Sequence, residues 1–137
     1  MAFKNKYAAP KIGDNVTFCK TMTVAEQTMF TGISGNLGGL YVDRRKAQAV
    51  GLTDMIVFEM AAASLLSTCL SRLAGPDFRI ARVETNFDNA VSVGATIEAS
   101  ATLTSKTDEG LTFRLTLKDS QSPFCDGEAL LVPVQGS

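Results

Sequence analysis

The sequence predicts an α+β domain in which an antiparallel sheet curves around one buried helix. An apolar run from Met55 to Leu73, rich in Ala, Leu and Met, has the composition of a long buried helix. The segments after it alternate apolar and polar residues and are joined by short turns, which is typical of consecutive antiparallel strands. A single apolar helix needs a surface to cover it, and a curved sheet supplies that surface.

One strand and two shorter helices are predicted before the central helix. Residues Asn15–Met22 alternate in polarity, which predicts a half-buried strand. Thr23 stands three residues before a glutamate, the pattern of a capping box, so we expect a helix over Val24–Ile33. The glycine-rich stretch Ser34–Gly39 ends that helix, and a short helix is expected over Asp43–Ala49 with the aspartate as its N-cap.

Four strands are predicted after the central helix, which ends in an Ala-Gly-Pro sequence at residues 74–76. Turn signals at residues 108–110 and 120–123 separate the last three strands. The predicted strands are Phe78–Asp88, Ala95–Lys106, Leu111–Leu117 and Phe124–Val134.

Length and composition favour one globular domain over residues 1–137, with residues 1–11 as an N-terminal extension. Apolar residues make up 45% of the chain and charged residues 20%, an ordinary globular mixture. Thirteen basic and 14 acidic residues give a net charge of −1. This balance argues against a nucleic-acid-binding face, which would gather positive charge.

The three cysteines, Cys19, Cys69 and Cys125, have neither the number nor the spacing of a disulfide framework or a metal site. We therefore expect reduced thiols, a cytoplasmic location and a place for Cys69 in the core. The chain has no histidine, which excludes imidazole catalysis and a His-ligated metal. No signal peptide is expected at the start of the sequence. The longest apolar run is too short and too polar for a membrane span.

The order and spacing of six local sequences resemble the MaoC-like (R)-specific enoyl-CoA hydratases of the hot-dog fold superfamily. The resemblance extends from about Ile12 to Val134. Phe58–Leu65 is similar to the His-Gly-Met-x-x-Ala-Ser-Leu with which the family's central helix begins. The six sequences are Gly13–Asp14, Thr21–Glu26, Ser34–Asp43, Phe58–Leu65, Val93–Gly94 and Asp126–Ala129. The resemblance implies a hot-dog fold, with a curved antiparallel sheet wrapped around one long helix.

The family's catalytic Asp-x-Asn-Pro-x-His loop is altered in this chain. Asn36 stands at the Asp position and Tyr41 at the His position, while Gly38 and Gly39 replace the Asn and the Pro. An amide cannot act as a general base, and an unperturbed tyrosine has a pKa near 10, so it is mainly a neutral donor. Asn36 and Tyr41 are therefore expected to orient a carbonyl group or a water molecule. Left-handed backbone at Asn36 and simple packing of Tyr41 are the structural alternatives.

Glu59 is the candidate that replaces the missing base. It lies in an apolar run otherwise free of ionisable groups, and the resemblance extends to hot-dog dehydratases and thioesterases that place a carboxylate early on the central helix. A carboxyl group tuned by its surroundings can shuttle a proton near neutral pH. The alternative is a surface carboxylate or an ion pair with Arg79 or Arg82.

Further residues are predicted to contact the substrate. They lie in the glycine-rich loop and around Glu59: Gly35, Gly38, Gly39, Phe58, Met60 and Ser64. Ser64 has the alternative of bonding back to its own helix. The resemblance implies an acyl group carried by coenzyme A or by the phosphopantetheine of a carrier protein, with no other cofactor and no metal. It also implies at least a homodimer. Arg44, Arg45 and Arg82 are candidates for contacts with phosphate.

Three functions remain open from the sequence. The first is a lyase that hydrates or dehydrates acyl thioesters, or an isomerase that moves their double bond, with Glu59 as acid/base and Tyr41 and Asn36 as orienting donors. The second is thioester hydrolysis by water that Glu59 activates. The third is a non-catalytic subunit that binds an acyl chain or completes a partner's site.

Overall fold

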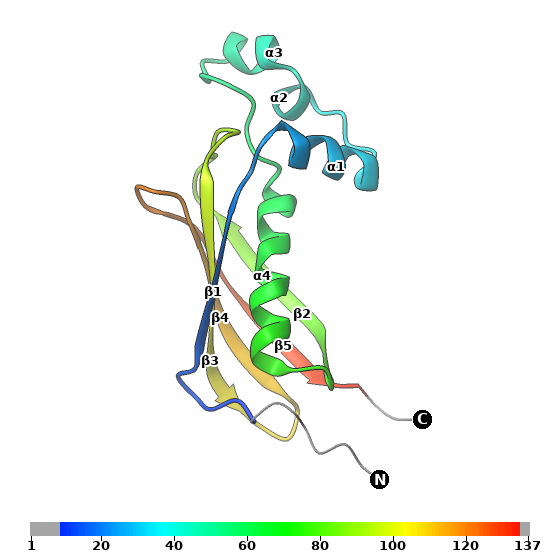
Figure 1. Cartoon of the computed structure of the whole chain (residues 1–137), viewed down its shortest axis with the longest axis vertical. Helices are drawn as coiled ribbons and strands as arrows, with labels where there is room; N and C mark the ends of the chain where they lie inside the picture. The colour runs from blue at the N-terminus through cyan, green and yellow to red at the C-terminus, as the bar shows by residue number, and fades with distance from the viewer. Residues whose placement is uncertain (1–8, 135–137) are drawn as a thin grey trace.

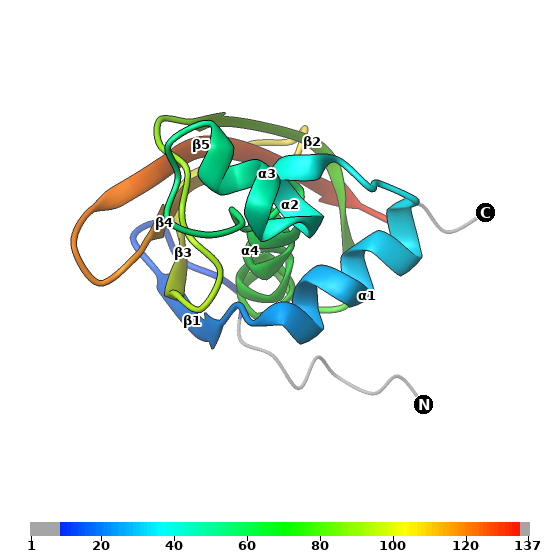
Figure 2. The ribbon, with the colours of Figure 1, turned by 90° about the horizontal axis from the view of Figure 1, so that it is seen from above.

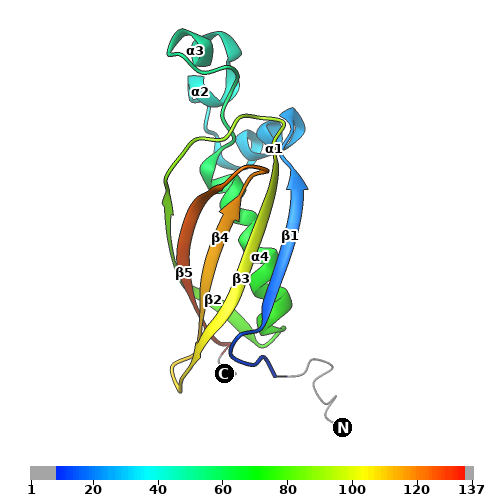
Figure 3. The same ribbon diagram turned by 90° about the vertical axis from the view of Figure 1, so that its left-hand side faces the viewer.

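The computed structural model describes residues 9–134, in which five strands form one antiparallel sheet in the order β1-β3-β4-β5-β2. The strands are β1 (Asn15–Thr21), β2 (Phe78–Phe87), β3 (Thr96–Lys106), β4 (Leu111–Lys118) and β5 (Pro123–Pro133). The helices are α1 (Val24–Ser34), α2 (Gly39–Val42), α3 (Arg44–Ala49) and α4 (Glu59–Ala74). Helix α4 lies along one face of the sheet (Figure 1), and the strands lie side by side in front of it in Figure 3.

The core lies between the sheet and α4. Figure 2 looks along α4 and shows the sheet curving around it. Every second side chain of β4 is buried, from Leu111 to Leu117, and α4 contributes buried residues that include Leu66 and Leu70. Full burial of one such side chain stabilises the fold by about 1.5–3 kcal/mol. The α+β class is therefore confirmed, and so is the place of Cys69, which is 0% exposed.

Helix α4 begins at Glu59 and not at Met55, where the apolar run predicts its start. The residues before it are extended and buried: Ile56 pairs with Ser92, and the Val57 N–H donates to the Val91 carbonyl (2.8 Å). A continuous apolar run fits a buried extended segment as well as a buried helix. The start of the helix predicted from polarity alone, at Met55, is therefore wrong. The correction puts Glu59 in the first turn of the helix.

Helices α1, α2 and α3 gather at the end of the molecule where α4 begins (Figure 1). The predicted capping box of α1 is confirmed, with Thr23 and Glu26 bonding each other's backbone. Asp43 caps α3 as predicted, because its carboxylate accepts from the N–H groups of Arg45 and Lys46. Residues 40–42, between the glycine-rich stretch and Asp43, lie in the single turn of α2.

Residues 1–8 of the predicted N-terminal extension lie outside the described residues. In the part of the chain that the structure describes, no helix is long and apolar enough to cross a membrane. Its three cysteines are free thiols, of which Cys69 and Cys125 are buried.

Candidate active site

Two of the predicted catalytic residues meet at the N-terminus of α4. The Tyr41 hydroxyl donates a hydrogen bond to Glu59 Oε1 at 2.6 Å, across 18 residues of sequence. Both side chains are partly buried. The alternative that paired Glu59 with Arg79 or Arg82 is wrong, because the partner of Glu59 is Tyr41. Among the described residues, Arg82 instead forms ion pairs with Glu84 and Glu128.

Aromatic packing holds the Tyr41 ring in place. It stacks on Phe58 with 4.4 Å between ring centroids and 10° between the ring planes. Phe30 of α1 packs on the same Phe58 ring at 4.7 Å. Phe58, which is 2% exposed, is thus a support beneath Tyr41. Its predicted contact with substrate stays a prediction.

The hydrogen bond to Glu59 raises the pKa of Tyr41 from 10.0 to about 12, with burial as a second cause. Ionising the phenol would break the bond and put two negative charges side by side. Tyr41 is therefore a protonated donor at neutral pH. The prediction that it orients a partner and does not act as a base agrees with this chemistry.

The backbone around Glu59 adds hydrogen-bond donors to the site. The first bond within α4 runs from the Ala62 N–H to the Phe58 carbonyl (3.0 Å), and the N-cap residue Phe58 provides no side-chain cap. The N–H groups of the first turn are thus left for solvent or a ligand. The partial positive charge at this helix end favours a negatively charged group.

Asn36 lies in the same loop as Tyr41 but does not bond the Tyr41–Glu59 pair. Its Oδ1 accepts from the Gly38 N–H (2.8 Å), which closes the turn before α2. The left-handed backbone considered for Asn36 is wrong, because in the described residues only glycines have positive φ, among them Gly35 at 75°. Its orienting role stays a prediction.

The glycines of this loop allow close packing around Tyr41. A Cβ on Gly38 would lie 3.1 Å from Asn36 Oδ1 and 3.2 Å from Cδ2 of Tyr41. A Cβ on Gly39 would lie 2.6 Å from Cδ of Lys46, a side chain that can move. The close approaches at Gly38 are to Asn36 and to the Tyr41 ring, so this glycine helps to place both candidate residues of the loop.

The other predicted substrate contacts are spread over the first turns of α4. Ser64 donates to the Ala61 carbonyl (2.5 Å), as its structural alternative expected, and also lines a cavity of about 150 Å³ between α1 and α4. Met60 is 74% exposed. Of the candidate phosphate contacts, Arg44 is bonded to Asp54 at 2.9 Å, whereas Arg45 is an exposed residue of α3.

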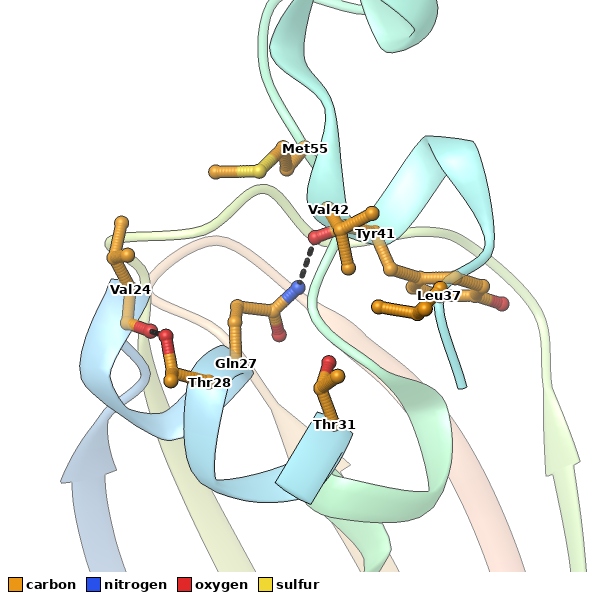
Figure 4. A pocket seen from close by; sticks show the side chains of 8 residues that line it. All are labelled: Val24, Gln27, Thr28, Thr31, Leu37, Tyr41, Val42 and Met55. Carbon is orange, nitrogen blue, oxygen red and sulfur yellow. Dashed lines mark hydrogen bonds between the residues drawn. The ribbon is translucent and has the colours of Figure 1, made fainter. Parts of the chain in front are cut away.

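A cavity of about 260 Å³ lies between α1 and the segment that carries Tyr41 (Figure 4). Its lining is largely apolar: Val24, Gln27, Thr28, Thr31, Leu37, Tyr41, Val42 and Met55. The Thr31 hydroxyl is buried there without a hydrogen-bond partner among the described residues. An apolar lining with few polar groups is typical of small-molecule sites.

Sequence reasoning missed Gln27, a buried polar residue of α1 that is 4% exposed. Its side-chain amide bonds the Tyr41 carbonyl, as Figure 4 shows. The only signal in the sequence was its position on the inward face of the helix. An apolar residue at that position would give the same signal, so nothing marked Gln27 as functional.

Comparisons with known proteins identify the family and the fold of the chain. A family model described as "MaoC like domain" matches residues 8–119. An (R)-specific enoyl-CoA hydratase of Rhodospirillum rubrum is 28% identical over 130 residues, covering 92% of this chain and 90% of that protein.

Solved structures share the fold. An (R)-hydratase of A. caviae involved in PHA biosynthesis has a TM-score of 0.85 at 23% identity, over 90% of this chain and 97% of that one. The R-hydratase PhaJ1 of Pseudomonas aeruginosa has a TM-score of 0.84 at 16% identity, over 93% and 87%. The predicted hot-dog fold is confirmed.

Proposed function

Because the chain belongs to the MaoC-like domain family, we propose that it is an acyl-thioester enzyme of the hydratase and dehydratase type with Glu59 as its acid/base group. The observation that carries the proposal is the 2.6 Å hydrogen bond from Tyr41 to Glu59. It fixes one carboxylate oxygen and leaves the other for a water molecule or the substrate. The relative named (R)-specific enoyl-CoA hydratase supports the choice of reaction.

Hydration of a 2-enoyl thioester then needs a single carboxylate. Glu59 accepts a proton from water as the water oxygen bonds to C3, and the C2=C3 double bond shifts its electrons toward the thioester carbonyl. The carboxylic acid so formed returns the proton to C2, which restores the carboxylate. Dehydration is the same sequence reversed. Tyr41 holds the carboxylate in place by its hydrogen bond throughout.

The free N–H groups at the start of α4 support the proposal that the thioester oxygen binds there. Negative charge develops on that oxygen as water adds, and donors fixed in advance stabilise such charge. The cavity that shares Tyr41 with the pair supports a place for the hydrocarbon part of the acyl group, because most of its lining is apolar. Coenzyme A or a carrier-bound phosphopantetheine forms the rest of the substrate.

The test is turnover of 2-enoyl-CoA substrates of increasing chain length by the purified chain, followed by loss of the enoyl-thioester absorbance. We expect Glu59→Gln to lower kcat/KM by about 100-fold or more, because the amide cannot exchange the proton. Tyr41→Phe should lower it by about 10- to 100-fold, because the carboxylate loses its orientation. The matched control is Glu109→Gln, at an exposed residue in the turn between β3 and β4.

The same assay separates the other two functions. If the parent releases free thiol from saturated acyl-CoAs and Glu59→Gln does not, the function is thioester hydrolysis and not hydration. A chain that binds acyl-CoA without turning it over would be a binding subunit. Full activity of Glu59→Gln would refute the role of this carboxylate.

A further inference from the structure

Gln27 makes three hydrogen bonds from one buried side-chain amide. Nε2 donates to the carbonyl oxygens of Tyr41 (2.8 Å) and Ile56 (3.0 Å), and Oε1 accepts from the Phe58 N–H (3.1 Å). Both N–H donors and the carbonyl oxygen of the carboxamide are thus bonded, each in a buried or partly buried bond. A buried amide whose nitrogen and oxygen atoms are all bonded fixes its neighbours strongly, because breaking a bond leaves an unpaired group without water.

All three partners belong to the two segments that carry the candidate catalytic pair. One is Tyr41 itself, and another is Phe58, the N-cap residue immediately before Glu59. The two segments also share one direct backbone bond, from the Ile56 N–H to the Leu40 carbonyl (3.0 Å). Gln27 therefore attaches α1 to both segments and holds them at one separation.

We infer that Gln27 is the positioning residue of the Tyr41–Glu59 pair: its carboxamide sets the separation between the α2 turn and the start of α4, and so keeps the Tyr41 hydroxyl against the Glu59 carboxylate. The effect of Gln27 on turnover rests on the proposed function, whereas its effect on the geometry of the pair does not. Gln27 is placed to act through Tyr41 and Glu59 and not on substrate.

Only a carboxamide meets the requirements at this position. The two carbonyl groups need N–H donors, and the Phe58 N–H needs an acceptor. Methionine has a similar size but provides neither kind of bond. Glutamate keeps the acceptor but turns an oxygen toward two carbonyl oxygens, which repels them. Gln27→Met thus removes all three hydrogen bonds, whereas Gln27→Glu removes only the two that the amide nitrogen donates.

The composition of the chain allows the pair to be observed directly. It contains no tryptophan and two tyrosines, Tyr7 and Tyr41. A Tyr7→Phe background therefore leaves Tyr41 as the single source of the phenol signal. Its ¹³Cζ chemical shift at neutral pH and its ultraviolet ionisation curve both report whether the hydroxyl donates to a carboxylate.

We expect Gln27→Met and Gln27→Glu to move the Tyr41 signal toward that of Glu59→Gln, in which the carboxylate is absent, while far-ultraviolet circular dichroism shows that the chain stays folded. The matched control, Gln121→Met in the turn before β5, should keep the parent signal. If the parent turns over enoyl-CoA, kcat should fall by about 10- to 100-fold in the Gln27 variants, with a smaller change in KM.

An unchanged Tyr41 signal in a folded Gln27→Met protein would overturn the inference, whatever the activity. A moved signal in a chain whose parent is inactive on thioesters supports the inference and refutes the proposed function. The parent alone gives a second test if neither variant folds. The Nε2 protons of Gln27 should exchange with solvent much more slowly than those of the exposed Gln121, and equal rates would overturn the inference.

Discussion

The phenol of Tyr41 and the carboxylate of Glu59 have unequal parts in the candidate site. The phenol is a fixed donor, because its hydrogen bond to Glu59 raises its pKa to about 12. The carboxylate is the group able to accept and return a proton. In the proposed reaction one residue orients and the other reacts, which differs from the Asp/His pair that the resemblance associates with the family's loop.

The first prediction concerns the titration of Tyr41. In the Tyr7→Phe background the phenol should ionise near pH 12, and Glu59→Gln should bring the midpoint back toward 10.0, the ordinary value. Because the pKa is higher in the folded chain, the stabilisation by this bond is complete below pH 10 and is lost as the pH rises toward 12. Ultraviolet titration measures the midpoint, and urea unfolding at several pH values measures the loss.

A midpoint near 10 in the parent would contradict the hydrogen bond. The hydrogen bond would also be contradicted if Glu59→Gln and the parent lost stability in parallel above pH 10. Asp14, an exposed carboxylate before β1, offers Asp14→Asn as a control that should leave the Tyr41 midpoint in place.

At this scale the sequence predicts residues but not their contacts. Glu59 stands out because it is the one ionisable residue in an apolar run, and Tyr41 because of its place in the loop. Their hydrogen bond spans 18 residues, so it depends on how two segments fold together. Gln27 was missed because polarity predicts an exposed residue, and only the structure shows three bonds that compensate its burial.

At the scale of elements, local chemistry fixes the ends of helices better than apolar content does. The start of α1 follows from the Thr23–Glu26 capping box, which side chains and backbone form within one turn. The start of α4 carries no side-chain cap, and the buried segment before it is as apolar as the helix. That is why the first boundary was predictable and the second was placed at Met55.

The second prediction tests the capping box. Thr23→Ala should lower the free energy of unfolding by about 1 kcal/mol, because the N–H of Ala25 loses its side-chain acceptor. Thr28→Ala, the same change at an exposed position within α1, should be close to neutral. Urea unfolding followed by circular dichroism measures both, and equal losses would contradict the cap.

The pH dependence of stability in acid tests the same cap independently. Hydrogen bonds from the Thr23 side chain and backbone lower the pKa of Glu26 from 4.5 to about 2. A lowered pKa in the folded chain stabilises it above pH 4.5, and this contribution is lost as the pH falls toward 2. Glu26→Gln should therefore flatten the dependence of stability on pH over that range, and a slope equal to the parent's would contradict the assignment.

At the scale of the whole molecule, the sheet ends in β2, an edge strand with one side that no strand of the described residues pairs with. β2 pairs only with β5, so one side of its ten residues is left without a strand partner in the described chain. Ile80 and Val83 of β2 are 43% and 45% exposed. A long edge with exposed apolar residues is a template for pairing with another strand.

The third prediction follows from this edge and agrees with the homodimer expected from the sequence. Two copies related by a two-fold axis can pair β2 with β2 antiparallel, which continues the sheet and covers Ile80 and Val83 in both. The chain should therefore elute as a dimer, with twice the monomer mass of 14.6 kDa in light scattering. Val83→Asp should give monomers, because pairing would bury two carboxylates in an apolar contact.

The opposite edge of the sheet offers the control. β1 is shorter than β2, with seven residues, and Thr17 is exposed on it. Thr17→Asp should leave the dimer intact, so that only a charge on β2 dissociates the chains. A monomeric parent, or a dimer that Thr17→Asp dissociates and Val83→Asp does not, would move the interface away from β2. If the Val83→Asp monomer keeps the parent's turnover of enoyl-CoA, the Tyr41–Glu59 site is complete within one chain.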